Sequence, residues 1–363
     1  MIYILFFSFL ILGALLSWKG KSPLYLACLM LFLFCIIGFR GLDVGPDTPG
    51  YVADFLSYSH LTYSEIIVAI KGSKEPLYVF ITWFASCLSS DYIVFLLLWA
   101  LFPCVALYTT LRDNLEQSRE YVIAIVVFFL IGLFAFFVAG IRQTAALSIL
   151  LYSYRYLKNI DLLHTSTLLK NKSTYLFVVC FLCAYLIHNS SLLFIFALPL
   201  KYIRFRSWFV LLALGGYFLG QYVRLDFLTQ LSSSLFDSRF SIYGNTYESS
   251  LSMSGYYMQL ILFLLGFYKR KKLLEQDNEN AFFLNMMMVG LIFQSMTGLI
   301  AEMYRVSFFF SIYSIVLIPR AVSCYDGNGK RNYVYPIVLF CSLFYLFFLS
   351  SANMPLYSTS INF

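Results

Sequence analysis

The stretch Pro23–Tyr51 reads PLYLACLMLFLFCIIGF followed by RGLDVGPDTPGY. Its first part, Pro23–Phe39, carries no charged residue, whereas Arg40–Tyr51 holds one arginine, two acids, three glycines and two prolines. Glycine and proline stop a helix and let the backbone bend closely around a ligand. Polar groups at the end of a membrane helix are costly, so they commonly mark a functional site. The stretch therefore predicts an apolar helix that ends in a polar, functional turn.

The composition of the whole chain indicates a membrane protein. Of its 363 residues, 61% are hydrophobic and only 12% are charged, with a mean hydropathy of +0.79. A soluble domain carries about 25% charged residues. Apolar runs follow one another along the chain, each near the ~20 residues that cross ~30 Å of hydrocarbon. We therefore expect an all-α polytopic membrane protein with one transmembrane domain over residues 1–363.

About twelve apolar runs are predicted to span the membrane. They are residues 2–17, 23–39, 92–110, 120–138, 141–157, 174–188, 190–203, 208–224, 255–268, 281–300, 304–319 and 334–351. A shorter apolar stretch, Pro76–Leu88, is predicted to be re-entrant or interfacial, because the lysine-rich loops then all lie on the inner side. On this topology residues 40–75 and 225–254 form outer loops, and both termini face outward.

Single arginines lie at the outer ends of three predicted helices, at Arg40, Arg142 and Arg305. The planar guanidinium forms two parallel hydrogen bonds to phosphate oxygens and does not lose its proton. Arg142 and Arg305 begin helices, where the backbone also favours anions. These arginines predict an outer site for a diphosphate.

Each arginine also has a structural interpretation, which the sequence leaves open. The alternative to phosphate binding is a helix cap or a headgroup contact for Arg142, an interfacial anchor for Arg40, and an ion pair with Glu302 for Arg305. Arg239 lies in a loop rich in Ser, Tyr and Asn, which favours a solvated surface position.

Proton transfer has three candidate residues. His188 ends an apolar run and titrates near neutral pH, although a histidine at a helix end is often a hydrogen-bonded packing residue. Asp43 and Asp47 resemble paired carboxylates, but turn formation explains aspartate in a glycine-rich loop equally well.

Several other classes of site are missing from the sequence. It has no P-loop, no dinucleotide-binding glycine pattern and no cysteine or histidine cluster with zinc spacing. We therefore expect neither a metal nor a cofactor. The net charge of +7 comes from the inner lysine-rich loops, so we expect no nucleic-acid partner.

The segment Arg40…Asp47-Thr48…Tyr51, the pair Arg142-Gln143, His188 and Arg305 together resemble EpsG-type and Wzy-type polysaccharide polymerases. The resemblance covers nearly the whole chain. It implies a metal-independent glycosyltransferase in the bacterial cytoplasmic (inner) membrane, with a GT-C-like, lipid-facing cavity on the outer side. The donor and acceptor would be glycans linked to undecaprenyl diphosphate, with a chain-length regulator and a flippase as partners.

The corresponding hypothesis for the mechanism assigns a role to each candidate residue. Arg142 and Arg305, supported by Arg40, bind the leaving diphosphate, and Asp47 or His188 takes the acceptor proton. The remaining candidates are expected to bind or orient substrate: Asp43, Tyr51, Gln143, Arg239 and Glu302.

Three other functions remain as alternatives at this point. A glycan ligase would use the same diphosphate site with a different acceptor. A lipid-linked-oligosaccharide flippase would need cationic residues along a path within the bilayer, and a non-enzymatic assembly subunit would not need the outer arginines. The sequence also leaves open whether the product is O-antigen of lipopolysaccharide, capsule or exopolysaccharide.

Overall fold

The computed structural model describes residues 2–16, 20–161, 170–222, 254–298, 303–324, 334–349 and 353–360. These residues form helices joined by turns, and within them the one β-pairing is an isolated bridge between Arg40 and Thr359. The prediction of an all-α protein is confirmed for this part of the chain. The chain divides into two units, Met1–Phe194 with Arg331–Phe363, and Ile195–Lys330.

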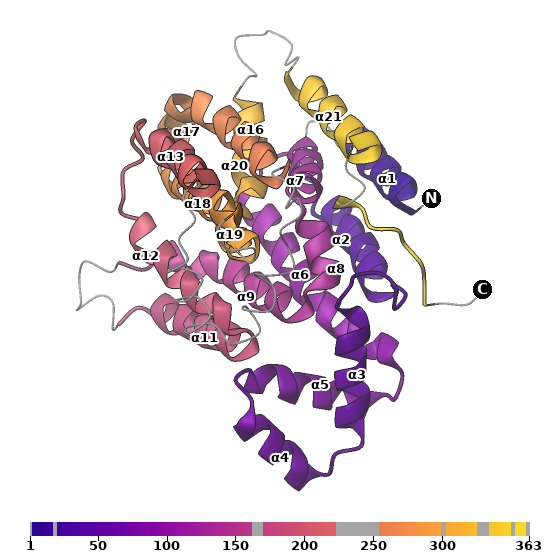
Figure 1. Cartoon of the computed structure of the whole chain (residues 1–363). Helices are drawn as coiled ribbons and strands as arrows, with labels where there is room; N and C mark the ends of the chain where they lie inside the picture. The colour runs from indigo at the N-terminus through magenta and orange to yellow at the C-terminus, as the bar shows by residue number, and fades with distance from the viewer. Residues whose placement is uncertain are drawn as a thin grey trace. The chain divides into compact units, whose positions relative to one another are not determined.

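The first unit contains most of the helices (Figure 1). They are α1 (Ile2–Leu16), α2 (Pro23–Gly38), α3 (Thr48–Ser59), α4 (Tyr63–Gly72), α5 (Pro76–Leu88), α6 (Tyr92–Asn114), α7 (Ser118–Leu130), α8 (Leu133–Ala139), α9 (Ile141–Leu157), α11 (Lys172–Ile187), α21 (Val334–Phe344) and the π-helix η3 (Tyr345–Leu349). The 3₁₀ helix η1 (Asn189–Phe196) follows α11 and reaches the boundary with the second unit.

The second unit is also helical. Its elements are α12 (Ala197–Leu200), α13 (Phe209–Tyr222), α16 (Ser254–Tyr268), α17 (Arg270–Gln276), α18 (Glu279–Ser295), η2 (Met296–Gly298), α19 (Met303–Ser311) and α20 (Ser314–Ser323). Within this unit α18 packs against α13, α16, α19 and α20, so it forms the centre of the packing.

Local sequence explains where the main helices of the first unit begin. Helix α2 starts at Pro23, whose fixed φ suits the first helical turn, and the Ser22 hydroxyl accepts a hydrogen bond from the Tyr25 amide at 3.2 Å. Helix α6 starts after Asp91, whose carboxylate accepts from the Ile93 amide at 2.9 Å. These caps satisfy backbone donors that no helical carbonyl can reach.

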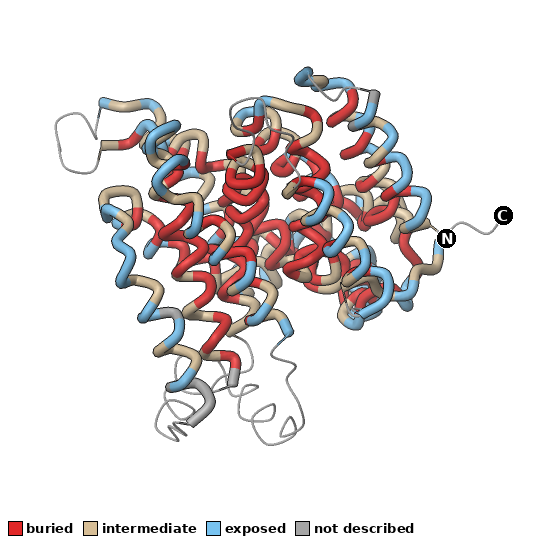
Figure 2. The backbone as a smooth tube through the Cα atoms, turned by 90° about the horizontal axis from the view of Figure 1, so that it is seen from above, coloured by how far each residue is buried: buried red, intermediate tan, exposed pale blue. Residues whose placement is uncertain are grey.

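The core of the first unit is built around α6 and α9. Helix α6 packs against α2 and α9, and α9 also packs against α11. Every residue of α7 except Arg119 is buried. On most helices buried and exposed positions lie on different sides (Figure 2), and the exposed sides of α2, α6 and α11 carry large apolar residues. Such open apolar faces are those of helices that contact lipid.

The described helices differ from the twelve predicted spans. By length and apolar character, α6 alone is suited to cross a membrane by itself, and two bent helix pairs bring the number among the described residues to at most three. The predicted run 120–138 is divided by Gly132, at φ +80°, into α7 and α8 with a bend of 63°. The run 304–319 is divided into α19 and α20 with a bend of 49°. Hydropathy alone does not detect these breaks, because each run stays apolar on average across its break.

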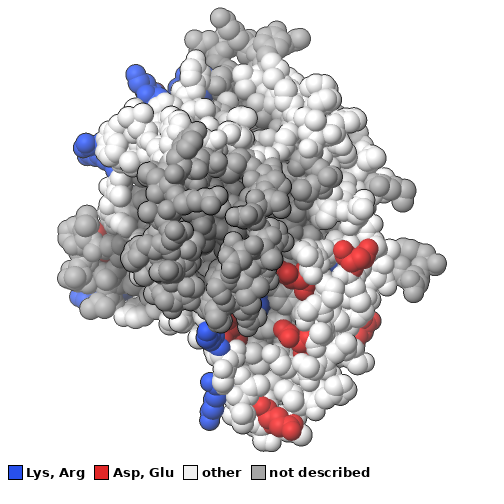
Figure 3. All heavy atoms as spheres, in the orientation of Figure 1, with Lys and Arg blue, Asp and Glu red and all other residues white. Residues whose placement is uncertain are grey.

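The predicted outer loop 40–75 contains two helices, α3 and α4. Both pack against α5, the short apolar helix predicted to be re-entrant or interfacial. At 1.5 Å per residue α5 is about 20 Å long, less than the ~30 Å hydrocarbon core. Most of the described surface in Figure 3 is uncharged, and acidic side chains gather in its lower part, where Figure 1 shows α3 and α4.

The turn between α2 and α3 is held by residues far along the chain. The Gly41 amide donates to the Ser358 carbonyl at 3.0 Å, and the Ser360 amide donates to the Phe39 carbonyl at 3.0 Å. Gly45 has a φ of +89°, and a Cβ there would lie 2.5 Å from the Val138 carbonyl oxygen at the end of α8. The turn therefore fits its surroundings only with glycine at position 45.

We predict that Gly45→Ala destabilises the protein by about 1–3 kcal/mol, because alanine meets both an unfavourable backbone conformation and the Val138 carbonyl. Thermal unfolding in detergent, followed by loss of the monodisperse peak in size-exclusion chromatography, measures the effect. Gly50→Ala is the matched control, since nothing lies within 4 Å of a Cβ at that helical position. Equal stability of the two variants would show that the turn tolerates a side chain.

Candidate functional site

The Glu75 carboxylate joins two residues that are distant in sequence. Its Oε2 accepts from Arg142 Nη1 at 2.6 Å, and its Oε1 lies 2.6 Å from His188 Nδ1. All three residues belong to the first unit. The structure thus brings together two of the predicted catalytic residues, Arg142 and His188, through an acid that the sequence analysis did not select.

Each of the three side chains lies at a helix end. Glu75 is the N-cap residue of α5, Arg142 is in the first turn of α9, and His188 is the C-cap residue of α11. Helix α11 packs against both α5 and α9, so these ends meet. Pro76 sets the start of α5, and Gly140 precedes the start of α9. The local helix boundaries therefore determine where the charged groups lie.

Two tyrosines pack on the Arg142 guanidinium. Its central carbon lies 5.2 Å from the ring centre of Tyr78 and 5.5 Å from that of Tyr51, and the two rings meet edge to face. The Tyr78 hydroxyl donates to Asp54 Oδ2 at 2.9 Å. Cation–π contacts of this kind hold a guanidinium in place and leave part of its edge for other partners.

The Glu75 side chain is only 12% exposed, yet its hydrogen-bond donors keep it ionised. Burial raises the pKa of this carboxyl, but the His188 hydrogen bond and charge, the Arg142 guanidinium and the Asn189 amide outweigh burial and lower it overall. A buried carboxylate needs such donors to remain charged. Glu75 therefore acts as an anion that orients its cationic and imidazole partners.

Several polar side-chain atoms that follow His188 in the chain have no partner within the described ranges. Asn189 Oδ1, Ser190 Oγ and Ser191 Oγ directly follow His188, are buried, and have no hydrogen-bond partner in the part of the chain that the structure describes. Arg142 Nε is likewise buried and has no hydrogen-bond partner among the described residues, although the Arg142 side chain as a whole is 38% exposed. Buried polar groups are nearly always hydrogen-bonded, so this set is suited to a polar ligand.

Arg40 lies in a different environment from Arg142. Its side chain is 1% exposed, Nη1 donates to the Ile37 carbonyl at 2.6 Å, and Nε lies 3.4 Å from Thr48 Oγ1. Burial lowers the pKa of Arg40 to about 10, which the Tyr357 and Tyr51 phenol groups partly oppose. The guanidinium is thus still charged at neutral pH and fastens the turn that leads into α3 and Tyr51. Direct contact of Arg40 with substrate stays a prediction.

The other predicted residues of this unit lie around the turn and in α9. The Asp43 carboxylate accepts a hydrogen bond from the Ser358 hydroxyl. Asp47 is the N-cap residue of α3 but makes no side-chain capping bond. Gln143 is buried beside Arg142 in α9. None of the described groups of His, Cys, Asp and Glu side chains has the arrangement of a metal site.

Arg305 lies in α19, in the second unit, where Nε donates to the Tyr304 hydroxyl at 3.0 Å. Its convergence with Arg142 stays a prediction. Arg239, Glu302 and nearly all of the predicted outer loop 225–254 lie outside the described residues.

The sequence analysis missed Glu75, Tyr78 and Asp54. A signal for Glu75 was present, since it is the one acid directly before Pro76 at the start of a short apolar stretch. Acids are common in the first turn of any helix, so this signal did not separate Glu75 from an ordinary cap. Tyr78 and Asp54 have no signal in sequence, because only the packing of α3 against α5 joins them.

The chain was compared with known proteins and families. No curated protein and no solved structure matches it. The family described as the EpsG family matches residues 24–360, which include α2 except Pro23, the residues Glu75, Arg142 and His188 (the Glu75 cluster) and Arg305. This match, with the apolar helices described above, identifies a polysaccharide polymerase-type membrane protein, and the chain belongs to the EpsG family.

Proposed function

We propose that this protein is a glycosyltransferase that joins oligosaccharide repeat units linked to undecaprenyl diphosphate into a long polysaccharide. The reaction takes place at the outer face of the bacterial cytoplasmic membrane. The observation that supports it best is the Glu75 carboxylate held between Arg142 and His188, at 2.6 Å from each. Such a cluster offers a cation for a diphosphate and a base for a sugar hydroxyl in one place.

Arg142 stabilises the departing diphosphate. When the acceptor oxygen attacks the anomeric carbon of the donor sugar, the bond from that carbon to the diphosphate oxygen breaks, and its electron pair stays on the diphosphate. Arg142 Nε has no partner among the described residues, so it is suited to a phosphate oxygen. The Tyr51 and Tyr78 rings keep the guanidinium in place as charge develops beside it.

His188 takes the proton of the acceptor hydroxyl. With Nδ1–H donating to Glu75, Nε2 is the ring nitrogen that can accept a proton. Glu75 fixes this tautomer and stabilises the imidazolium that forms, as the acid does in a Ser-His-Asp triad. Asp47, the other base considered from the sequence, has no described contact with this cluster, so the geometry favours His188.

The buried polar atoms after His188 are suited to hold the acceptor sugar. Asn189 Oδ1, Ser190 Oγ and Ser191 Oγ supply acceptors and hydroxyl donors next to the proposed base. A sugar presents several hydroxyl groups that can pair with such atoms. We assign these three residues to the orientation of the attacking hydroxyl.

Arg305 supplies a second cation for the diphosphate in this proposal, and its place near the start of α19 suits an anion. Donor and acceptor both carry a lipid, so the site has to open toward the membrane.

We predict that Arg142→Ala and Arg305→Ala each lower the polymerisation rate about 10²–10³-fold, because each removes a group that stabilises the leaving diphosphate. Arg142→Lys is expected to fail as well, since a point charge cannot replace the planar fork. The measurement is complementation of a deletion strain, with the surface glycan separated on gels. Single repeat units should remain while the ladder of longer products is lost.

Arg270→Ala is the matched control for these arginine variants. Arg270 begins α17, where Nη1 donates to the Phe267 carbonyl at 3.0 Å, and it has no role in the proposal. Long polymer made by normally expressed Arg142→Ala or Arg305→Ala protein would refute the assigned roles. Full-length polymer that is no longer attached to its final lipid would instead indicate a ligase.

We predict that His188→Ala lowers the rate about 10²–10⁴-fold, as expected for loss of a general base. Glu75→Gln keeps the shape of the side chain but removes its charge, so it should lower the rate in the same direction. The double variant should be no slower than His188→Ala alone, because the two residues act as one unit. Rates are measured with purified protein and lipid-linked donor and acceptor, over a range of pH.

The pH profile separates catalysis from folding. A rise of the wild-type rate with pH that reports deprotonation of the general base should be absent in His188→Ala. His60→Ala is the control, since His60 is an exposed residue at the end of α3. A pH limb that persists in His188→Ala would assign the base to another residue, with Asp47 tested next.

A further inference from the structure

An apolar groove of about 460 Å³ runs between α6, α9 and α11. Its walls come from one face of α6, from the middle of α9 and from the middle of α11. The lining residues are Leu98, Leu101, Phe102, Val105, Ala106, Ser148, Ile149, Tyr152, Val179, Cys180 and Cys183. The lining surface is almost wholly apolar. On α6 the residues follow the spacing of a single helical stripe, so the groove runs along the helix rather than around it.

One end of the groove points toward the Glu75 cluster. Arg142 and Ile149 are seven residues apart in α9, a spacing that places them two turns apart on the same face of a helix. Along α11 the groove residues Val179 and Cys183 are followed by His188 at the C-cap. The two helices that carry Arg142 and His188 therefore also form the groove.

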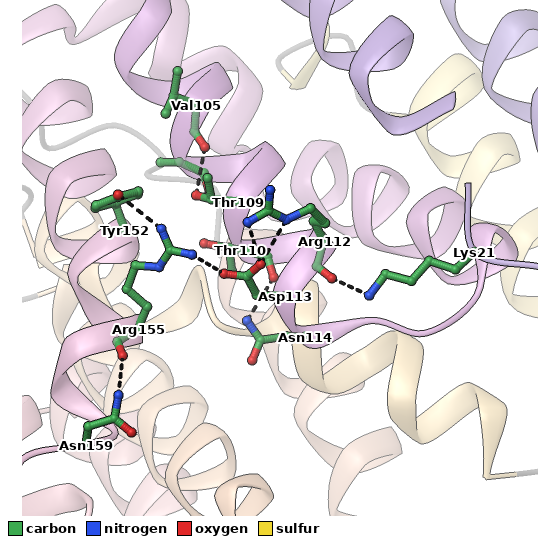
Figure 4. A network of polar contacts seen from close by, with 11 residues as sticks. Lys21, Val105, Thr109, Thr110, Arg112, Asp113, Asn114, Tyr152, Arg155 and Asn159 are labelled. Carbon is green, nitrogen blue, oxygen red and sulfur yellow. Dashed lines mark hydrogen bonds and ion pairs between the residues drawn. The ribbon is translucent and has the colours of Figure 1, made fainter. Parts of the chain in front are cut away.

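An ion-pair network lies next to Tyr152, at the other end of the groove (Figure 4). Arg155 of α9 donates to Asp113 of α6 at 2.6 Å and to the hydroxyl of Tyr152, which lines the groove, at 3.1 Å. Asp113 also accepts from Arg112 at 2.9 Å. Arg142 and Arg155 are about 20 Å apart along the helix, from the rise of 1.5 Å per residue. The groove thus lies between two charged regions, and at the Arg142 end Arg142 Nε has no hydrogen-bond partner among the described residues.

We propose that this groove holds the first part of the isoprenoid tail of a polyprenyl diphosphate whose head group lies at Arg142. This inference rests on the proposed function. The pairing of an apolar channel with a cation at one end matches a ligand that has an anionic head and a long hydrocarbon tail. An ordinary phospholipid also has an acyl chain, but its head offers one phosphate where the cluster presents several donors.

The main effect of the groove would be to orient the lipid-linked substrate. Lipid is as apolar as the groove, so no hydrophobic gain drives the tail from one to the other, and only packing favours binding. A tail fixed along α9 aligns the anomeric carbon with His188, which restricts the substrate before the reaction. The expected contribution to affinity is therefore modest.

The test compares a long-chain polyprenyl diphosphate with dimethylallyl diphosphate, which has a head but almost no tail. Both are radiolabelled and bound to full-length protein in phosphatidylglycerol nanodiscs. Val105→Trp and Val179→Trp fill the groove from α6 and from α11. We expect each to weaken binding of the long-chain ligand about five- to tenfold, in line with a packing contribution, and to leave binding of the short ligand unchanged.

Val178→Trp is the matched control. Val178 neighbours Val179 on α11 and is 45% exposed, close to the 50% of Val105, but it does not line the groove. Unchanged binding of the short ligand shows that each variant is folded. A diazirine on the first isoprene units should in addition label peptides that contain groove residues.

Two results would overturn the inference, and they can be told apart. If Val105→Trp and Val179→Trp bind the long-chain ligand like the wild type while Arg142→Ala does not, the groove does not hold the tail and the diphosphate site remains. If Arg142→Ala binds both ligands like the wild type, or the wild type binds neither, the proposed function fails and the groove assignment fails with it.

Discussion

The interaction on which the candidate site depends is the shared carboxylate of Glu75. A charge in a nearly buried position is stable only when donors replace the water that it has lost. Here the Arg142 guanidinium, the His188 ring nitrogen and the Asn189 backbone amide supply those donors, from two distant parts of the chain. The carboxylate therefore ties the starts of α5 and α9 to the end of α11. It also sets the orientation of Arg142 and His188, which are the two groups that could carry out chemistry.

The fold separates two kinds of surroundings along the same helices. In α9 and α11 the middle turns line an apolar groove, while the ends nearest the Glu75 cluster carry polar groups. Charged groups are costly within hydrocarbon, so helix ends are the positions where a membrane protein can keep them. A substrate with an anionic head and an apolar tail fits this division. The arrangement thus links where the helices end to which molecules the protein can hold.

The charges of the cluster are balanced before substrate arrives. Glu75 offsets Arg142, and the Tyr51 and Tyr78 rings hold the guanidinium from its face without using its edge for a second ion pair. A diphosphate that enters brings negative charge, which Arg142 Nε, without a partner among the described residues, can meet at short range. Arg40, although also an arginine at a helix end, is enclosed and serves the turn before α3. Position within the fold, rather than residue type, separates the two arginines.

The sequence by itself determined the class of the protein, because composition and apolar runs depend only on which residues are present. It also selected Arg142, His188 and Tyr51, since polar residues at the ends of apolar helices stand out without any structure. Only the tertiary structure decided that Arg142 and His188 share one carboxylate, because Glu75, 67 and 113 residues away from them, resembles an ordinary cap until α5 packs against α11. The breaks in the predicted spans likewise could not be derived from the sequence. Hydropathy measures the affinity of residues for lipid, whereas a bend at Gly132 follows from backbone conformation and from contacts that the sequence does not show.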